Sequence, residues 1–279
     1  MISLGIMQGR LTPSKGRGIQ FFPFENWKRE FEIGAEIGLD EIEWIFDYDN
    51  YHENPLWSKQ GTMDLIDTID HTGVKVRSIC FDYFMRRPFY KVKDKNLRQE
   101  NLEFVKRNLE AMSWIGASLL EIPFVDNSSV NEGEQKYVIE FLHEILDLSK
   151  KMNIKIGCET DMSVGAFRAF LDQIDDDNIY ANYDSGNSSG LGYDHEEEIH
   201  SLSEYIVNVH IKDRMLHGTT VQLGNGSADF DKVFSALRDI GYDQSILLQA
   251  ARSDDGDEVN NIKKQMIFVK DYCLKYGLK

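Results

Sequence analysis

Cysteine is scarce in this chain, and so is any sequence that would separate domains. There are three cysteines among 279 residues, Cys80, Cys158 and Cys273, and they are widely spaced and odd in number. Such a set predicts free, reduced thiols and a cytoplasmic protein rather than a disulfide framework. No Pro/Ser-rich linker, low-complexity tract or long internal repeat interrupts the sequence. We therefore expect a single domain over residues 1–279.

Long apolar runs and an excess of positive charge are also missing. No apolar stretch approaches the roughly 20 residues that span a bilayer, and "MISLGIMQGR" lacks the features of a signal peptide. Lys and Arg number 31 against 47 Asp and Glu, a net charge of −16, which disfavours nucleic acid and anionic membranes as partners. The expected partner is a small molecule, and a homo-oligomer is left open.

The sequence instead contains a regular alternation of strand and helix patterns. Eight short apolar runs predict strands at 3–7, 41–46, 74–81, 118–125, 154–159, 179–184, 205–211 and 245–250. Eight strand–helix units of about 35 residues each favour an α/β fold, a single (β/α)8 barrel. A doubly wound sheet is the alternative, but no Gly-x-Gly-x-x-Gly follows the first strand.

The connections between the predicted elements are unequal in length. Helix-to-strand turns such as "IGLD" and "TGVK" are short, and left-handed caps are expected at Gly38, Gly73, Gly116, Asn153 and Gly241. Strand-to-helix loops such as "RLTPSKGRGIQFFPFEN" and "DRMLHGTTVQLGNGS" are long. In a barrel these long loops share the face that carries active sites, so a functional site is predicted there.

Polar residues recur at the ends of the predicted strands. The last four strands end in Glu159, Asp184, His210 and Gln249, about one strand–helix unit apart. One imidazole, two carboxylates and an amide oxygen suit Mn²⁺, Mg²⁺ or Co²⁺ better than they suit structural zinc. A metal-free layer of hydrogen-bonded polar residues is an equal alternative. The other six histidines, at 52, 71, 143, 195, 200 and 217, are expected on the surface.

The motifs "IGCET", "NYDSGN", "NVHIKDR" and "ILLQAAR", with "GNGSADFDKVFSALRDIGY", resemble the xylose-isomerase-like TIM-barrel superfamily from the first strand to the last. The resemblance implies a sugar or sugar-phosphate isomerase or epimerase, of the ketose 3-epimerase type. It implies one divalent metal ion (Mn²⁺, Mg²⁺, Co²⁺ or Zn²⁺) bound by Glu, Asp, His and Glu. Glu159, Asp184 and His210 match, whereas Gln249 replaces the second glutamate. Asn187 stands where several epimerases have a substrate-binding histidine.

The resemblance also indicates how the reaction would proceed. Glu159 is the expected catalytic base, which removes a proton next to a carbonyl to form an enediolate. Gln249 cannot transfer a proton, which weakens two-base epimerisation and leaves one-base isomerisation possible. Glu43, Asp82 or Asp213 could supply a missing acid. The alternatives are a metal-dependent keto-polyol dehydratase and a non-catalytic carbohydrate-binding barrel. The family's endonuclease branch is excluded, because the strand ends offer too few histidines and no basic cleft.

Several further residues are predicted to bind substrate. The strand-end arginines Arg10, Arg214 and Arg252 suit a phosphate or carboxylate, unless they are solvated or paired with acids. Glu43 and Asn187 complete the predicted substrate-binding set. The turn "GNGS" (224–227) could also hold a phosphate on its backbone amides.

Overall fold

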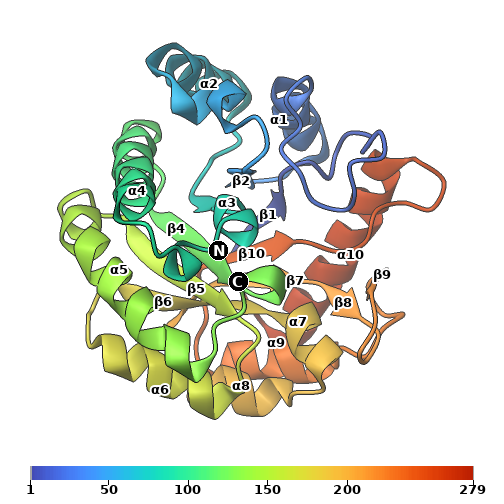
Figure 1. Ribbon diagram of the computed structural model, residues 1–279. Helices are drawn as coiled ribbons and strands as arrows, with labels where there is room; N and C mark the ends of the chain where they lie inside the picture. Colours follow the sequence, from blue (N-terminus) through green and yellow to red (C-terminus); the bar gives the residue numbers. More distant parts are fainter. Residues whose placement is uncertain (1, 279) are drawn as a thin grey trace. The chain divides into compact units, whose positions relative to one another are not determined.

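The structure is a computed structural model, and it describes residues 2–278. Eight parallel strands close a barrel in the order β1-β10-β7-β6-β5-β4-β3-β2 (Figure 1). This confirms the predicted (β/α)8 barrel and excludes the open doubly wound sheet. The strands are β1 Ser3–Met7, β2 Glu41–Ile45, β3 Ser78–Cys80, β4 Leu119–Phe124, β5 Lys155–Thr160, β6 Ile179–Asp184, β7 Ile206–Ile211 and β10 Ser245–Leu248.

Each of the eight predicted strands is present, but two details differ. Of the segment predicted as a strand at 74–81, only Ser78–Cys80 forms a regular strand, and Lys75 makes an isolated β-bridge to Glu41. A hairpin of β8 (Asp213–Arg214) and β9 (Thr220–Val221) lies within the segment predicted as an irregular loop. The hairpin forms because His217, with φ of 54°, turns the chain back in the left-handed region.

Helices follow the strands around the chain. They are α1 Trp27–Ile37, α2 Lys59–Thr72, α3 Tyr83–Arg86, α4 Lys95–Ile115, α5 Glu132–Lys151, α6 Val164–Ile174, α7 Ser185–Leu191, α8 His195–Ser201, α9 Phe230–Asp239 and α10 Glu258–Tyr276. The predicted caps are confirmed: all five residues have positive φ, with Gly38 at 80° and Asn153 at 55°. These left-handed residues end the helices sharply before the next strand. No helix in residues 2–278 is long and apolar enough to cross a membrane.

Contacts within the chain divide it into two compact units. The first comprises Met1–Glu43, Thr72–Lys75 and Ala181–Lys279, and the second comprises Trp44–His71 and Val76–Tyr180. In the first unit, α9 packs beside α10, where Phe234 stacks on Tyr272 with ring centroids 5.1 Å apart (Figure 1). In the second, Phe104 stacks on Tyr83 at 4.0 Å within a cluster of aromatic rings. One domain over residues 1–279 stays a prediction.

Strand β1 requires a glycine where it pairs with both neighbouring strands. Gly5 lies opposite Glu41 of β2 and Leu247 of β10. A Cβ at this position would lie 2.4 Å from both Glu41 Cγ and Leu247 Cδ2. The side chains of Glu41 and Leu247 therefore occupy the space that a side chain at position 5 would need.

Replacing Gly5 by alanine should destabilise the protein by about 1–3 kcal/mol, the usual cost of forcing atoms into a packed core. Urea unfolding measures this as a lower midpoint. Gly165 on α6 is the matched control, because a Cβ there meets nothing within 4 Å and alanine favours the helix. An unchanged midpoint for Gly5→Ala would contradict the packing described.

Candidate metal centre

His210 lies on β7 among polar residues of the neighbouring strands. The strand register sets His210 opposite Asp184 of β6 and opposite Leu247 of β10. Asn208 is two residues earlier on the same strand and therefore shares its face. His210 is completely buried. Because buried polar groups need partners, the contacts of this ring determine what it can bind.

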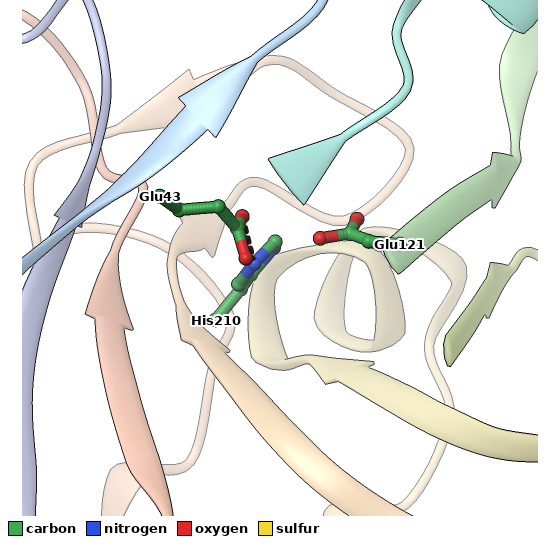
Figure 2. A group of neighbouring side chains, drawn as sticks. All are labelled: Glu43, Glu121 and His210. Carbon is green, nitrogen blue, oxygen red and sulfur yellow. Dashed lines mark hydrogen bonds and ion pairs between the residues drawn. The ribbon is translucent and has the colours of Figure 1, made fainter. Parts of the chain in front are cut away.

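A carboxylate from β2 fixes the protonation of the His210 ring. His210 Nε2 lies 2.9 Å from Glu43 Oε1 (Figure 2), and Asn208 Nδ2 donates to Glu43 Oε2 at 3.0 Å. Glu43 is fully buried, and an ionised carboxylate only accepts hydrogen bonds. The neutral ring therefore carries its proton on Nε2 and has its lone pair on Nδ1. Asn182 Nδ2 lies 3.2 Å from that Nδ1.

Asp184 presents one carboxylate oxygen to the same ring nitrogen. Its Oδ1 accepts the backbone N–H groups of Gly186 and Asn187, each at 2.8 Å, and so caps α7. Its Oδ2 lies 4.0 Å from His210 Nδ1 and 3.4 Å from Lys212 Nζ. The helix cap holds the carboxylate so that Oδ2, rather than Oδ1, faces the imidazole.

Asp184 and His210 are potential metal ligands within one compact unit, and Asp184 Oδ2 lies 4.0 Å from His210 Nδ1. A metal ligand must offer a lone pair, and the hydrogen bond to Glu43 leaves that lone pair on Nδ1. The donor pair that fits a cation is therefore Asp184 and His210, with Glu43 as the partner that orients the ring. Glu159, the remaining predicted carboxylate ligand, is buried at the end of β5 in the other unit, and its role stays a prediction.

Gln249 has the polarity expected of an additional oxygen ligand. It lies just beyond β10, on the same side of the strand as Leu247, and is 5% exposed. Its Nε2 donates to Gln20 Oε1 at 3.0 Å. Its buried Oε1 has no hydrogen-bond partner within the described part of the chain. A buried carbonyl oxygen left without a donor fits a hard divalent cation.

The predicted substrate residues after β6 and β7 are brought together. Asn187 Oδ1 accepts hydrogen bonds from Lys212 Nζ and from Arg214 Nη1, each at 3.2 Å. Arg214 also donates to the carbonyl of Gly218. Two cationic groups therefore lie beside Asn187, close to the candidate ligand Asp184.

The other two predicted arginines contact the protein itself. Arg10 is 3% exposed and donates to the carbonyl of Ala250 at 3.2 Å and to Gln20 Oε1 at 3.3 Å. Arg252 donates to the carbonyls of Gly9, Thr12 and Ile19 and pairs with Glu258 at 3.1 Å. Both side chains hold the loop after β1, and their contact with substrate stays a prediction.

A buried carboxylate, Glu30 of α1, holds the same loop from the other side. Its oxygens accept the backbone N–H groups of Gly9 at 2.7 Å and Leu11 at 3.1 Å, and the Thr12 hydroxyl at 2.8 Å. Burial raises the pKa of Glu30 to about 6, opposed by the hydrogen bonds from Gly9, Thr12 and Leu11 and by the charge of Arg252.

Two expectations about neighbouring residues are wrong. His195 is not on the surface: it is 3% exposed, its Nδ1 lies 2.6 Å from the Tyr183 hydroxyl, and burial lowers its pKa to about 4. The turn "GNGS" does not offer free amides, because the N–H groups of Gly224 and Gly226 donate to Asp213 Oδ2. Asp213, proposed as a spare acid, is fully buried in this turn.

Sequence reasoning missed Lys212, Gln20, Asn208 and Glu30. Lys212 and Asn208 flank His210 at a spacing of two residues, so strand periodicity alone could have placed them on its face. Gln20 and Glu30 carry no comparable signal. Gln20 lies in the long loop after β1, and Glu30 contacts that loop from α1; the sequence does not indicate the path of the loop.

Comparisons with known proteins agree with this architecture. The family model described as xylose isomerase-like TIM barrel matches residues 31–272. The chain is 23% identical to the Shigella flexneri protein named L-ribulose-5-phosphate 3-epimerase UlaE, over 91% of this chain and 92% of that protein. Sugar epimerases are thus among its homologues.

Solved structures share the fold. A D-allulose 3-epimerase from Methylomonas sp., in complex with D-allulose, has a TM-score of 0.77 at 15% identity, and 97% of each chain is covered. The IOLI protein with a bound zinc atom has a TM-score of 0.75 at 18% identity, and 99% of each chain is covered. At these identities the likeness establishes the fold alone.

The raised pKa of Glu30 predicts a specific dependence of stability on pH. Between pH 4.5, the ordinary pKa of a glutamate, and about pH 6, the unfolded chain loses the Glu30 proton while the folded protein keeps it. Relative to Glu30→Gln, the wild type should therefore lose about 2 kcal/mol of unfolding free energy from pH 4.5 to pH 7. Urea unfolding of both proteins at the two pH values measures this. Glu36→Gln, an exposed change on the same helix, controls for net charge; parallel pH profiles for wild type and Glu30→Gln would refute the prediction.

The hydrogen bond from His210 to Glu43 predicts the ring's tautomer. In metal-free protein labelled with ¹⁵N-histidine, NMR should show His210 protonated at Nε2 and unprotonated at Nδ1, with His210→Asn assigning the signal. Glu43→Gln should populate the opposite tautomer, because its amide can donate to Nε2. A wild-type ring protonated at Nδ1 would contradict the assignment of the lone pair to that nitrogen.

Proposed function

Because this chain belongs to the xylose isomerase-like TIM barrel family, we propose that it is a divalent-metal-dependent isomerase or epimerase of a small sugar or sugar phosphate. The observation that carries the proposal is the buried pair Asp184 and His210, whose ring is oriented by Glu43 so that its lone pair is on Nδ1. The sugar epimerases among the homologues support the same class of reaction.

The proposed ligands are Glu159 and Asp184 oxygens, His210 Nδ1 and Gln249 Oε1. This set is one nitrogen and three oxygens without thiolate, which suits Mn²⁺, Mg²⁺ or Co²⁺, with Zn²⁺ also possible. A cation held there would polarise a carbonyl and its neighbouring hydroxyl, and so make the proton on the hydroxyl-bearing carbon easier to remove.

Glu159 is the proposed general base. It is 4% exposed, and it is the carboxylate of the matched set to which the family resemblance assigns proton transfer. Gln249 has no titratable proton near neutral pH, so its proposed role is that of a ligand or substrate contact only. A single base that takes and returns the proton on one face suits transfer of a carbonyl between adjacent carbons. Epimerisation would need a second acid, which Gln249 cannot be.

Asn187, Lys212 and Arg214 are the proposed contacts for the rest of the substrate. Their donors gather beside Asp184, and Arg214 is part-buried, which suits recognition of hydroxyl or phosphate oxygens. The named relatives include an epimerase of a ketose phosphate and one in complex with a free ketose. Both substrate classes therefore belong in the first screen, together with keto-polyols to detect a dehydratase. Cytoplasmic location and a homo-oligomer stay predictions.

Solvent deuterium exchange tests the proposal directly. Wild-type protein with Mn²⁺ should bind close to one ion per chain and should exchange deuterium into a ketose or ketose phosphate. Glu159→Gln should slow this exchange by about 10²–10⁴-fold, the usual contribution of a general base. NMR of the substrate in deuterated buffer measures the rate.

Metal content must be determined on the same samples, because Glu159 is also a proposed ligand. Glu132→Gln, an exposed change on α5, is the control and should leave exchange unchanged. Wild-type exchange in a metal-loaded Glu159→Gln protein would remove Glu159 as the base. Sugar binding without exchange or product would favour the non-catalytic barrel.

A further inference from the structure

We infer that Gln20 is a positioning residue that selects the amide orientation of Gln249, so that its oxygen rather than its nitrogen faces the metal ligands. The inference rests on the proposed function, since it concerns how one proposed ligand is presented to the cation. It follows from a series of hydrogen-bonded side chains, Arg10, Gln20 and Gln249. Each of the first two determines which end of the next amide, the oxygen or the nitrogen, faces it.

Arg10 determines the orientation of the first amide in this series of side chains. Its guanidinium has only donors and stays charged at any accessible pH. One nitrogen donates to the carbonyl of Ala250 at 3.2 Å, and the other lies 3.3 Å from the Gln20 amide. Because Arg10 is 3% exposed and cannot accept a hydrogen bond, Gln20 must present its oxygen to it.

Gln20 in turn determines the orientation of the Gln249 amide. Gln20 Oε1, which accepts from Arg10, also accepts a hydrogen bond from Gln249 Nε2 at 3.0 Å. If the Gln249 amide were rotated by half a turn, two carbonyl oxygens would face each other at a part-buried contact, which is unfavourable. The rotation is therefore disfavoured, and Oε1 is left on the opposite side of the amide.

The free side of the Gln249 amide is the side that a cation needs. Gln249 shares the face of β10 with Leu247, which pairs with His210, and its backbone N–H donates to the carbonyl of Ile211. Its Oε1 is buried and lacks a hydrogen-bond donor anywhere in residues 2–278. An amide oxygen is a good ligand for a hard cation, whereas an amide NH₂ has no lone pair to offer.

The loop that carries Gln20 is held independently of the metal site. Arg252 Nε donates to the carbonyl of Ile19, next to Gln20, at 3.2 Å. At the start of the loop, Glu30 accepts the N–H groups of Gly9 and Leu11. Gln20 therefore has a fixed backbone from which to orient its neighbour.

A double-mutant cycle tests this role with a readout that does not need substrate. The dissociation constant for Mn²⁺ alone is measured by titration calorimetry in wild type, Gln20→Met, Gln249→Glu and the double variant, with thermal unfolding as the check on folding. Met preserves the size of Gln20 but removes its acceptor. Arg10 then loses one of its acceptors and draws the Gln249 oxygen towards itself, so Gln20→Met should weaken Mn²⁺ binding about tenfold.

A carboxylate at position 249 has two equivalent oxygens and needs no orientation. In the Gln249→Glu background, Gln20→Met should therefore change Mn²⁺ binding by about twofold at most, which gives a strong coupling between the two positions. Gln20→Glu keeps an acceptor for both Arg10 and Gln249, and it should retain Mn²⁺ binding close to wild type.

The outcomes separate this inference from the function on which it rests. Wild type that binds no Mn²⁺, Mg²⁺, Co²⁺ or Zn²⁺ would refute the proposed function. Wild type that binds Mn²⁺ while Gln20→Met binds it equally well would overturn only the role of Gln20. The same weakening in both backgrounds would also overturn that role, because Gln20 would then support the loop in general.

Discussion

The hydrogen bond between His210 Nε2 and Glu43 Oε1, 2.9 Å long and fully buried, determines which chemistry the barrel interior can support. An imidazole has one lone pair when neutral, and this contact places it on Nδ1. Asp184 Oδ2 lies 4.0 Å from that nitrogen, so these two groups can offer lone pairs to one cation. Glu43 orients the proposed ligand, a role in which buried carboxylates commonly support metal-bound histidines.

Buried carboxylates recur as the devices that shape the loops around this site. Glu30 gathers the backbone N–H groups of the loop after β1, and Asp213 gathers those of Gly224, Gly226 and Ala228 after β9. Asp184 does the same for the first turn of α7. Each carboxylate takes the place of the water that these N–H groups would otherwise bind. A buried carboxylate is tolerated because these N–H groups donate hydrogen bonds to it. These contacts order the long loops in addition to the short elements, such as the β8–β9 hairpin, that the loops contain.

The amide of Gln249 affects both which reaction the site can catalyse and how a cation could be bound. As an amide it cannot share proton transfer with Glu159, yet its oxygen is left without a donor and suits a cation. An amide differs from a carboxylate, which the family resemblance implies at this position, because its two ends are not equivalent: one is an oxygen and the other an NH₂ group. The contacts of Gln249 with Gln20, and of Gln20 with Arg10, determine its orientation. An amide at this position therefore places a requirement on residues outside the ligand set.

The sequence by itself determined the barrel and the positions of its candidate ligands. Alternating apolar runs and glycine caps are local signals, and side chains at the ends of parallel strands must share one face of the barrel. Tertiary structure alone decided which partners these side chains have. The sequence predicts Glu43 and Arg10 as substrate contacts. In the structure, Glu43 of β2 contacts His210 of β7, although these strands are not neighbours in the barrel, and Arg10 donates to Gln20 and Ala250. His195 reads as a surface residue, but it is buried against Tyr183. Strand periodicity fixes the face on which a side chain lies, whereas its partner depends on register and loop path, which arise from contacts far apart in the chain.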